Sequence, residues 1–330
     1  MIDRVVTVGE ALAVFRTSPG QPLWRAEQVA VGTGGAEANV AMTLAHRGVP
    51  VTWAGRVGDD SLGRRVTREL QAEGVTVSAV RDVARPTGLL VKDVRGDGRT
   101  VVSYYRSDSA GSALSVTDVD DLALDLGSGV LLHLTGITSA LSPTAAEAVQ
   151  HLVSTARGRG ATISFDVNHR PRLWGDRSAD ASHRALAAAA DVLFASVDEV
   201  PFLVDGAPSV EPAASGGGDR AARAAAVLAA HGHRHVVVTD GSAGSAVSHD
   251  GVVASSPALD VAVVDTVGAG DAFVGGYLAA WSRGEDLPGR LVAGSVSGAA
   301  ACRHGGDWEG AVDLGGLPPR GGEGLDPVVR

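Results

Sequence analysis

Residues 265–281, DTVGAGDAFVGGYLAAW, decide both the fold class and the chemistry expected of this chain. The β-rich run before them, residues 261–264, is expected to end a strand. Gly268 and Gly270 then let the backbone turn tightly, so that several N–H groups point at one place. A helix that begins at about Asp271 adds the positive end of its dipole to these donors. The stretch therefore predicts an anion-binding turn that suits phosphate.

Asp271 has two interpretations. Asp is favoured in the first turn of a helix as a cap or a dipole partner. Beside a phosphate-binding turn, the same carboxylate can accept the proton of a substrate hydroxyl while that oxygen attacks a γ-phosphate. The surroundings favour the second interpretation, a kinase with Asp271 as base. Phe273, Tyr277, Leu278 and Trp281 follow at helical spacing and are interpreted as core.

Composition predicts a globular protein that acts on small molecules. The 330 residues, 45% of them hydrophobic, suffice for one large α/β domain or two smaller ones. A net charge of −10 argues against nucleic acid or an anionic membrane surface as the main partner. No apolar run approaches the roughly 18 residues of a membrane span. With a single cysteine, Cys302, and no signal-like N-terminus, the expected location is the cytoplasm.

Two common nucleotide-binding motifs are missing. Lys92 is the only lysine, and no GxxxxGK[S/T] string surrounds it, which excludes a Walker-type P-loop. Gly32, Gly34 and Gly35 do not have the GxGxxG spacing, which argues against NAD.

The N-terminal third predicts a βαβ-like unit and a hairpin. Residues 4–9 and 51–54 are expected strands, with a helix after Gly35 in which Asn39 either caps the helix or holds a sugar hydroxyl. Residues 87–92 and 100–105 are strand-like runs joined by the turn at 95–98, and this hairpin could form a lid.

Tyr104 and Tyr105 are expected on opposite faces of that hairpin, because strand side chains alternate. One ring is interpreted as core. The other, with Arg106, could grip an anionic or hydroxylated ligand, since a guanidinium pairs with a carboxylate through two bonds. An ordinary surface arginine is the alternative.

Polar residues follow several predicted strands, at the edge where α/β sheets bind ligands. Arg170 after the strand at 162–167 is a phosphate or carboxylate candidate. Glu199 orients a metal or water, or caps the next helix. A second glycine turn at 240–247 suits nucleotide phosphates or ribose.

Two segments resemble the signature regions of the ribokinase-like (PfkB) carbohydrate kinase family: GGAEANVAMTLAHRG at 34–48 and DTVGAGDAFVGGYL at 265–278. The segments GGAEAN, YYRSDSAGSAL, LHLTGITSALSP, SFDVNHRPRLW and GGDWEG together resemble 2-keto-3-deoxygluconate kinases more than ribokinases or fructokinases. The resemblance covers roughly residues 1–312.

The resemblance implies an α/β fold, the ribokinase-like α/β/α sandwich with a mostly parallel central sheet and a small β-lid. Residues 1–312 would be a single kinase domain, with lid segments at about 11–33 and 87–106, and residues 313–330 a disordered tail. Copies of the chain would associate through the lid as a homo-oligomer.

The resemblance also implies site residues and cofactors. Asp271 would be the catalytic base. The residues implied to contact the sugar acid are Gly35, Ala36, Glu37, Ala38, Asn39, Tyr104, Tyr105, Arg106, Arg170 and Asp307. Those implied to bind ATP are Asn168, Ser196, Thr239, Gly241, Gly244, Gly268, Ala269, Gly270 and Ser295. Mg²⁺ would arrive with ATP, with Glu199 and water nearby, and a potassium ion near Asp265 is kept as an option.

Three positions depart from the family pattern. Leu90 stands where a tyrosine facing the substrate is expected, Asp240 where relatives are basic or neutral, and Ser295 where an asparagine is expected near the adenine. The resulting hypothesis is an ATP-dependent kinase for the terminal hydroxyl of 2-keto-3-deoxygluconate. The alternatives are a fructokinase- or ribokinase-type enzyme for a neutral sugar and a non-catalytic sugar or nucleotide sensor.

Overall fold

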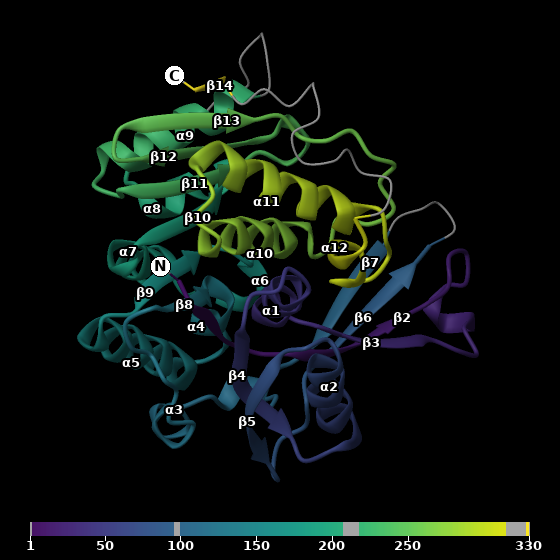
Figure 1. Ribbon diagram of the computed structural model, residues 1–330. Coiled ribbons are helices and arrows are strands. Elements are labelled where there is room, and N and C mark those ends of the chain that lie inside the picture. The colour runs from purple at the N-terminus through teal and green to yellow at the C-terminus, as the bar shows by residue number, and fades with distance from the viewer. Residues whose placement is uncertain (1, 96–99, 207–217, 315–327, 330) are drawn as a thin grey trace.

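The computed structural model describes residues 2–95, 100–206, 218–314 and 328–329 (Figure 1). Within these residues, ten strands form one large sheet in the order β14-β13-β12-β11-β10-β9-β8-β1-β4-β5. In chain order, the strands are β1 (Arg4–Val8), β4 (Val51–Gly58), β5 (Thr76–Asp82), β8 (Val130–Thr135), β9 (Thr162–Asp166), β10 (Val192–Ser196), β11 (His235–Thr239), β12 (Ser245–His249), β13 (Val252–Ser256) and β14 (Val328–Val329).

The large sheet is mostly parallel, as expected. All pairs from β5 across to β11 are parallel, for example Val5 with Val51 on one side and with Leu131 on the other. The pairs from β11 to β14 are antiparallel. In β14, Val329 pairs with Ala254, so the prediction of a disordered tail does not hold for residues 328–329; residues 315–327 and 330 lie outside the described residues.

Helices cover both faces of this sheet (Figure 1). One layer holds α1 (Ala36–His46), α2 (Ser61–Ala72), α10 (Ala269–Ser282), α11 (Leu287–Cys302) and the short α12 (Glu309–Val312). The other holds α3 (Val116–Asp121), α4 (Gly136–Leu141), α5 (Pro143–Arg159), α7 (Asp180–Ala189), α8 (Val200–Leu203) and α9 (Gly218–Ala230), with α6 (Pro171–Trp174) after β9. Short 3₁₀ turns are η1 (Leu23–Arg25), η2 (Gly111–Ala113), η3 (Val197–Glu199) and η4 (Gly241–Ala243).

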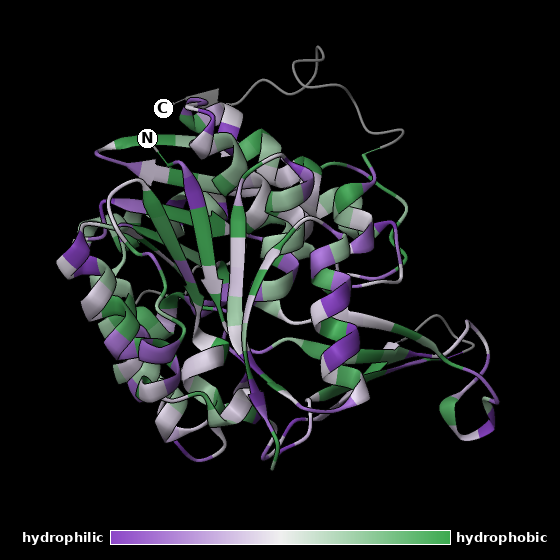
Figure 2. Ribbon diagram, turned by 60° about the horizontal axis from the view of Figure 1, so that its bottom comes forward, coloured by the Kyte–Doolittle hydropathy of each residue, from purple (hydrophilic) through white to green (hydrophobic). Residues whose placement is uncertain are grey.

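The central strands are hydrophobic on both faces, because each face is covered by helices. Along β1, Val6 and Val8 pack into one core cluster and Val5 into the other. Leu132 and Leu131 of β8 alternate in the same way. Colouring by hydropathy shows hydrophobic strands in the middle of the molecule and hydrophilic turns on the outer helices (Figure 2). The sandwich predicted from the resemblance is confirmed.

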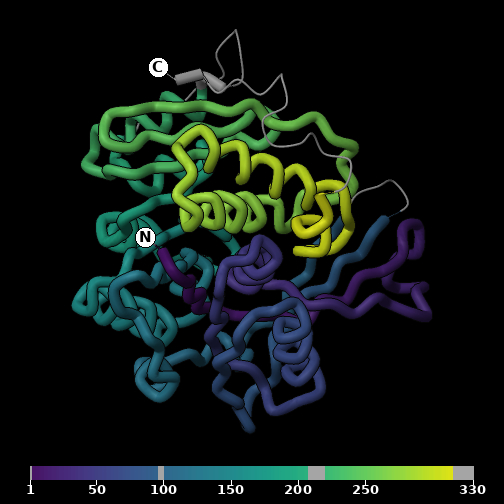
Figure 3. Tube along the Cα trace, in the orientation of Figure 1, coloured from purple at the N-terminus to yellow at the C-terminus, as the bar shows by residue number. Residues whose placement is uncertain are grey.

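A second sheet of four described strands has the order β3-β2-β6-β7. It contains β2 (Leu12–Arg16), β3 (Ala30–Gly34), β6 (Leu89–Val94) and β7 (Thr100–Tyr105), in which only the β2–β6 pair is parallel. These strands come from the two predicted lid segments, and the predicted hairpin is β6–β7, whose turn residues 96–99 lie outside the described residues. The chain trace brings this small sheet beside the C-terminal segment around α12 (Figure 3).

Some local predictions were wrong. Residues 261–264 form no strand, and α10 begins at Ala269 rather than Asp271. Asn39 is not a cap, because Gly35 is the N-cap of α1. Neither Tyr104 nor Tyr105 is core, since both side chains are exposed. In the described ranges, no helix has both the length and the apolar character to cross a membrane.

Candidate active site

The glycine turn that was predicted to bind an anion lies at the start of α10. Gly268 is the N-cap residue with φ +81°, the left-handed region that favours glycine. A Cβ there would lie 1.9 Å from the carbonyl oxygen of Asp307, so space as well as conformation requires glycine. The N–H of Ala269 donates to the carbonyl oxygen of Thr266 at 3.2 Å, whereas the N–H groups of Gly270 and Asp271 have no acceptor within the helix. Gly268, Gly270 and Asp271 line a cavity together with residues at the ends of β9 and β10.

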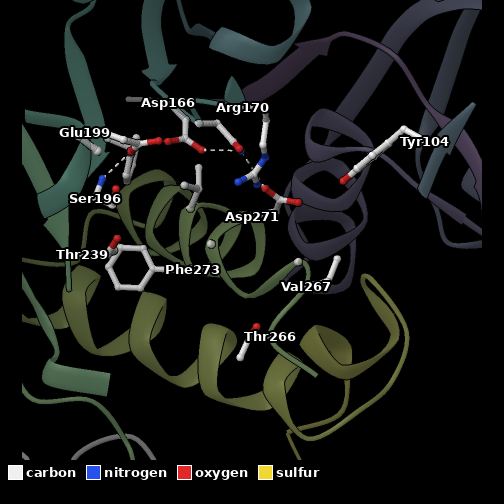
Figure 4. Close-up of a pocket in the computed structure, with 16 residues that line it drawn as sticks. Tyr104, Asp166, Arg170, Ser196, Glu199, Thr239, Thr266, Val267, Asp271 and Phe273 are labelled. Atoms are coloured by element: carbon white, nitrogen blue, oxygen red, sulfur yellow. Dashed lines mark hydrogen bonds between the residues drawn. The ribbon is translucent and has the colours of Figure 1, made fainter. Parts of the chain in front are cut away.

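Asp271 is held by two amides. Asn39 Nδ2 donates to its Oδ2 at 2.7 Å, and Asn168 Nδ2 donates to its Oδ1 at 3.3 Å. Burial raises the pKa of Asp271 above its ordinary value, whereas the Asn39 bond, the Arg170 charge and the Asn168 bond act in the opposite direction. Figure 4 shows the guanidinium of Arg170 beside this carboxylate. The carboxylate is therefore oriented, and it is more basic than an exposed aspartate.

Two adjoining cavities open on this turn in the described part of the chain. The first, of about 420 Å³, is lined by Asp271 and by polar residues at the ends of β9 and β10. The second, of about 520 Å³, runs between the glycine turn of η4 and α11, and Val261, Leu259 and Ala299 give it apolar walls. They share Thr239, Thr266, Gly270 and Phe273. A polar cavity joined to a more apolar one suits a phosphate chain with an aromatic base.

Two further carboxylates line the first cavity (Figure 4). Asp166 ends β9 and accepts from Asn168 Nδ2 at 3.1 Å. Burial, with the negative charges of Glu199 and Asp271, raises the pKa of Asp166 well above its ordinary value. Glu199 accepts from the backbone N–H of Ser196 at 2.7 Å and of His169 at 2.6 Å. Glu199 is thus the third residue of a capping box whose N-cap is Ser196, and it also faces the cavity. Its side chain makes no cap bond to the following helix α8, so the predicted capping of the next helix is not found.

The small sheet covers the first cavity from one side. Tyr104 lines it, and its hydroxyl points toward Asp271 in Figure 4. Leu90 and Tyr104 are directly paired across β6 and β7, so they share this inner face. Tyr105 lies on the outer face, 62% exposed, and lines neither cavity.

Arg106 is buried rather than on the surface. Its Nε donates to Glu10 Oε2 at 2.6 Å, and a terminal nitrogen contacts the same oxygen. Its guanidinium lies over the Tyr104 ring, with 5.5 Å to the ring centroid. Glu10 therefore compensates the positive charge that was expected to meet the substrate.

Lys92 is fully buried on the inner face of β6. Its ammonium lies 3.0 Å from Asp265 Oδ2 and 2.5 Å from Asp307 Oδ1. These ion pairs connect the small sheet to Asp265, which precedes the anion-binding turn in the chain, and to Asp307, whose main chain packs on that turn.

Residues 2–312 match the model of the pfkB family of carbohydrate kinases. The chain belongs to this family. Its members are phosphotransferases that act on a sugar hydroxyl, so this pfkB kinase is a carbohydrate kinase.

Relatives of this pfkB kinase act on different sugars. It is 32% identical to the 2-dehydro-3-deoxygalactonokinase of Haloferax volcanii over 91% of each chain. It is 33% identical to the 2-dehydro-3-deoxygluconokinase of Bacillus subtilis, over 92% of this chain and 91% of the relative. It is 34% identical to a fructokinase of Klebsiella pneumoniae, over 79% of this chain and 80% of the relative.

Solved structures confirm the fold. A PfkB protein from Polaromonas sp. has a TM-score of 0.78 at 31% identity, covering 91% of this chain and 96% of that one. The fructokinase of Vibrio cholerae, with fructose, ADP and calcium bound, has a TM-score of 0.79 at 26% identity, covering 94% and 96%. A double mutant of that fructokinase was solved with potassium bound.

The structure of this pfkB kinase brings most predicted site residues together. Those that line the first cavity are Tyr104, Asn168, Arg170, Ser196, Glu199, Thr239, Gly268, Gly270 and Asp271. Those that line the second are Thr239, Gly241, Gly244, Ala269, Gly270 and Ser295. Asp240, a departure beside the second cavity, accepts from Arg220 Nη1 at 2.8 Å, which compensates its charge.

The other predicted sugar-binding residues line neither cavity: Gly35, Ala36, Glu37, Ala38, Asn39, Tyr105, Arg106 and Asp307. Among them Glu37 is engaged elsewhere, since Thr135 Oγ1 and Thr138 Oγ1 donate to its Oε1 at 2.6 and 2.7 Å. Burial raises the pKa of this carboxyl.

Sequence reasoning missed Asp166, the pairing of Glu10 with Arg106 and the role of Lys92, although Glu10 was expected at a sheet edge that could meet a ligand. Asp166 carried a usable signal, because it ends a buried strand two residues before Asn168. The ion pairs of Glu10 and Lys92 carried none, since their partners Arg106, Asp265 and Asp307 are far away in the sequence.

Proposed function

We propose that this pfkB kinase transfers the γ-phosphoryl group of ATP to the terminal hydroxyl of 2-keto-3-deoxygluconate. The observation that carries the proposal is Asp271, fixed by Asn39 and Asn168 at the first turn of α10, next to N–H groups that can hold phosphate. A binding protein has no need for a raised-pKa carboxylate at this point, so the geometry supports catalysis over a sensor.

In the proposed reaction, Asp271 takes the proton of the terminal hydroxyl as that oxygen bonds to the γ-phosphorus. The bond from the γ-phosphorus to the bridging oxygen breaks, and ADP leaves. The N–H groups after Gly268 hold the negative oxygens of the phosphoryl group, with the guanidinium of Arg170 beside them. Asn39 and Asn168 fix the orientation of the Asp271 carboxylate through their hydrogen bonds to its two oxygens.

The donors in the first cavity fit Mg²⁺, the ion expected with ATP. Asp166 offers carboxylate oxygens there, and Mg²⁺ prefers oxygen ligands and keeps several waters. When bound, Mg²⁺ neutralises charge on the β- and γ-phosphate oxygens. Asp166 would hold the ion through water or directly, while Glu199 is engaged by the N–H groups of Ser196 and His169.

A sugar acid is favoured over a neutral sugar by the cations around the cavity. Arg170 lines it, and the guanidinium of Arg106 stacks on Tyr104, which also lines it. Glu10 occupies Nε and one terminal nitrogen of Arg106, and a guanidinium has further N–H donors on its other terminal nitrogen. The similarity to the two dehydro-deoxy-sugar-acid kinases supports the same choice.

A neutral sugar of the fructokinase or ribokinase type is the second candidate. The specific observation in its favour is that Glu10 neutralises Arg106, which reduces the attraction of the site for a carboxylate. The similarity to a fructokinase points the same way.

The test is ADP release with MgATP and a panel of 2-keto-3-deoxygluconate, its galacto epimer, fructose, ribose and no sugar. We expect much faster turnover on the two acids than on fructose or ribose. Arg106→Ala is then compared with wild type as the ratio of kcat/KM on acid to kcat/KM on fructose, because a ratio cancels any loss of folded protein caused by leaving Glu10 unpaired. We expect this ratio to fall about tenfold or more, the value of one hydrogen bond to a charged group.

An unchanged ratio, or better turnover on fructose than on either acid, would replace the sugar acid by the neutral sugar. Arg95→Ala, which removes an exposed arginine from the same small sheet region, is the control that should leave the ratio as it is.

Two further proposals concern the association of copies of the chain and its location in the cell. Association of copies through the small sheet would use its outer face, where Val101 and Tyr105 are exposed, and light scattering measures it. A cytoplasmic location is expected, and cell fractionation checks it.

A further inference from the structure

The chain has a single lysine, and the fold buries it completely. An ammonium removed from water is costly unless it is paired and hydrogen-bonded. Lys92 meets this requirement with Asp265 Oδ2 at 3.0 Å and Asp307 Oδ1 at 2.5 Å, and both carboxylates are themselves almost fully buried. Asp265 and Asp307 thus form a cation-binding site, and the cation that occupies it is the ammonium group of Lys92.

Both carboxylates of this site touch the anion-binding turn. Asp265 Oδ1 accepts the backbone N–H of Val267 at 3.1 Å. The main chain of Asp307 packs so closely on Gly268 that no Cβ would fit there. Any displacement of the Lys92 ammonium would therefore also move the residues that position the first turn of α10.

The charge of Lys92 also matters for phosphate. Asp265 and Asp307 place two buried negative charges behind a turn that is expected to bind phosphoryl oxygens. Asp271 and Glu309 add to the same field, since their charges act with burial to raise the pKa of Asp307, whereas Lys92 lowers it. Without a cation, this field would oppose both the anion and the ionisation of Asp307.

A potassium ion beside Asp265 does not fit this arrangement. The Asp265 oxygen that faces the cluster is already in contact with an ammonium, and a second cation there would be repelled by it. The residues present therefore disagree with the expectation of potassium at Asp265.

We propose that the Lys92 ammonium acts as a tethered monovalent cation: it positions the Asp265–Gly268 turn from the small sheet and makes this kinase independent of added potassium. The kinetic part of the inference rests on the proposed phosphoryl transfer, whereas its effect on unfolding does not.

The first experiment uses the wild-type protein. Phosphoryl transfer and the thermal unfolding midpoint are measured in potassium, ammonium, sodium and tetramethylammonium chloride at one ionic strength. We expect kcat, the KM for ATP and the midpoint to be the same in all four salts. A specific activation by potassium of about tenfold, or about 1.4 kcal/mol, would overturn the proposal.

The second experiment compares Lys92→Met with Arg95→Met. Both remove one positive charge from the same hairpin, but Arg95 is exposed. In tetramethylammonium, Lys92→Met should raise the KM for ATP and lower kcat, together about tenfold or more in kcat/KM. Potassium or ammonium, which are small enough to enter the space left by the ammonium, should restore part of the loss and raise the unfolding midpoint.

Arg95→Met should behave as wild type in every salt. A Lys92→Met protein that is impaired but gains nothing from potassium or ammonium, in rate or in midpoint, would show that Lys92 is only structural and would contradict the proposal.

If Lys92→Met does not fold, the double variant Lys92→Met/Asp307→Asn removes opposite charges together and keeps Asp265 as a cation site. A higher unfolding midpoint in potassium than in tetramethylammonium is expected for this variant, and equal midpoints would overturn the proposal. These midpoints remain decisive even if no tested sugar is phosphorylated, so failure of the proposed function and failure of this inference can be told apart.

Discussion

Asp271 and Asp307 are buried carboxylates on two sides of one glycine turn, and they are held in different ways. Asp271 is 8% exposed and Asp307 is 4% exposed, and burial raises the pKa of both. The partners of Asp271 are the neutral amides of Asn39 and Asn168. The partner of Asp307 is the ammonium of Lys92.

The difference shows how the partner, rather than burial, decides what a buried carboxylate can do. An amide donor orients a carboxylate but loses little when the carboxylate is protonated. An ammonium loses its counter-charge in the same event, which is expensive in a dry site. Asp271 is therefore suited to accept a proton during the reaction, whereas protonation of Asp307 would remove one of the two counter-charges of Lys92.

The largest effect is expected from replacing each of the two carboxylates in turn, in the variants Asp271→Asn and Asp307→Asn. Asp271→Asn should lower kcat about 10²–10⁴-fold, the usual contribution of a general base. Its unfolding free energy at neutral pH should be equal to or above that of wild type. The reason is that a raised carboxyl pKa means the native state disfavours the ionised form, and stability is lost as the pH rises through that pKa.

Asp307→Asn should show the opposite pattern. We expect it to lose about 1–3 kcal/mol of unfolding free energy, because a buried charge pair becomes incomplete, and to keep most of kcat. ADP release and urea unfolding measure the two quantities. Equal losses of kcat in the two variants would end the distinction between them.

The next prediction concerns the turn between these carboxylates. Gly268 and Gly284 flank α10 with φ of +81° and +76°, but only Gly268 has a close neighbour, the carbonyl oxygen of Asp307. Gly284→Ala should cost about 1–2 kcal/mol of unfolding free energy from left-handed strain alone, with kcat unchanged. Gly268→Ala adds the clash, so it should cost more and remove most activity.

Urea unfolding and ADP release are measured on both glycine variants. The difference between the variants gives the effect of the steric clash with the Asp307 carbonyl oxygen, separate from that of the left-handed backbone conformation. If Gly268→Ala kept wild-type kcat, the close packing of Asp307 on the turn would have no catalytic importance.

The sequence predicted the features that depend on neighbouring residues. Gly268, Gly270 and Asp271 lie within four positions, so the turn, the helix and the carboxylate at its start could be inferred together. The valines of β1 and the apolar run of β8 likewise predicted buried strands, because each is a short apolar segment of its own.

Features that depend on distant partners could not be inferred. Arg106 was expected at a ligand or on the surface, but Glu10, 96 positions away, pairs with it. The run at 261–264 was expected to be a strand because it is rich in valine, yet Val261 and Val263 line the second cavity instead. An apolar run fits a sheet or a ligand cavity equally well, and only the tertiary fold decides which.

The smallest predicted effect tests whether Asp271 is the titrating base. Because burial raises the pKa of Asp271, the acid limb of kcat/KM for the sugar should lie above the ordinary range of an aspartate, and activity should fall as the pH drops through it. Asn39→Ala removes a hydrogen bond that lowers this pKa, so the limb should move to higher pH, with less than about a tenfold loss on the plateau.

Thr43→Val, one turn along α1, removes a donor to the Asn39 carbonyl without touching Asp271 and should leave the limb in place. Rates at saturating MgATP across the pH range measure all three proteins. A limb that stays in place in Asn39→Ala would mean that another group, such as Asp166, controls the rate, and Asp271 would no longer differ from Asp307 in the way its amide partners suggest.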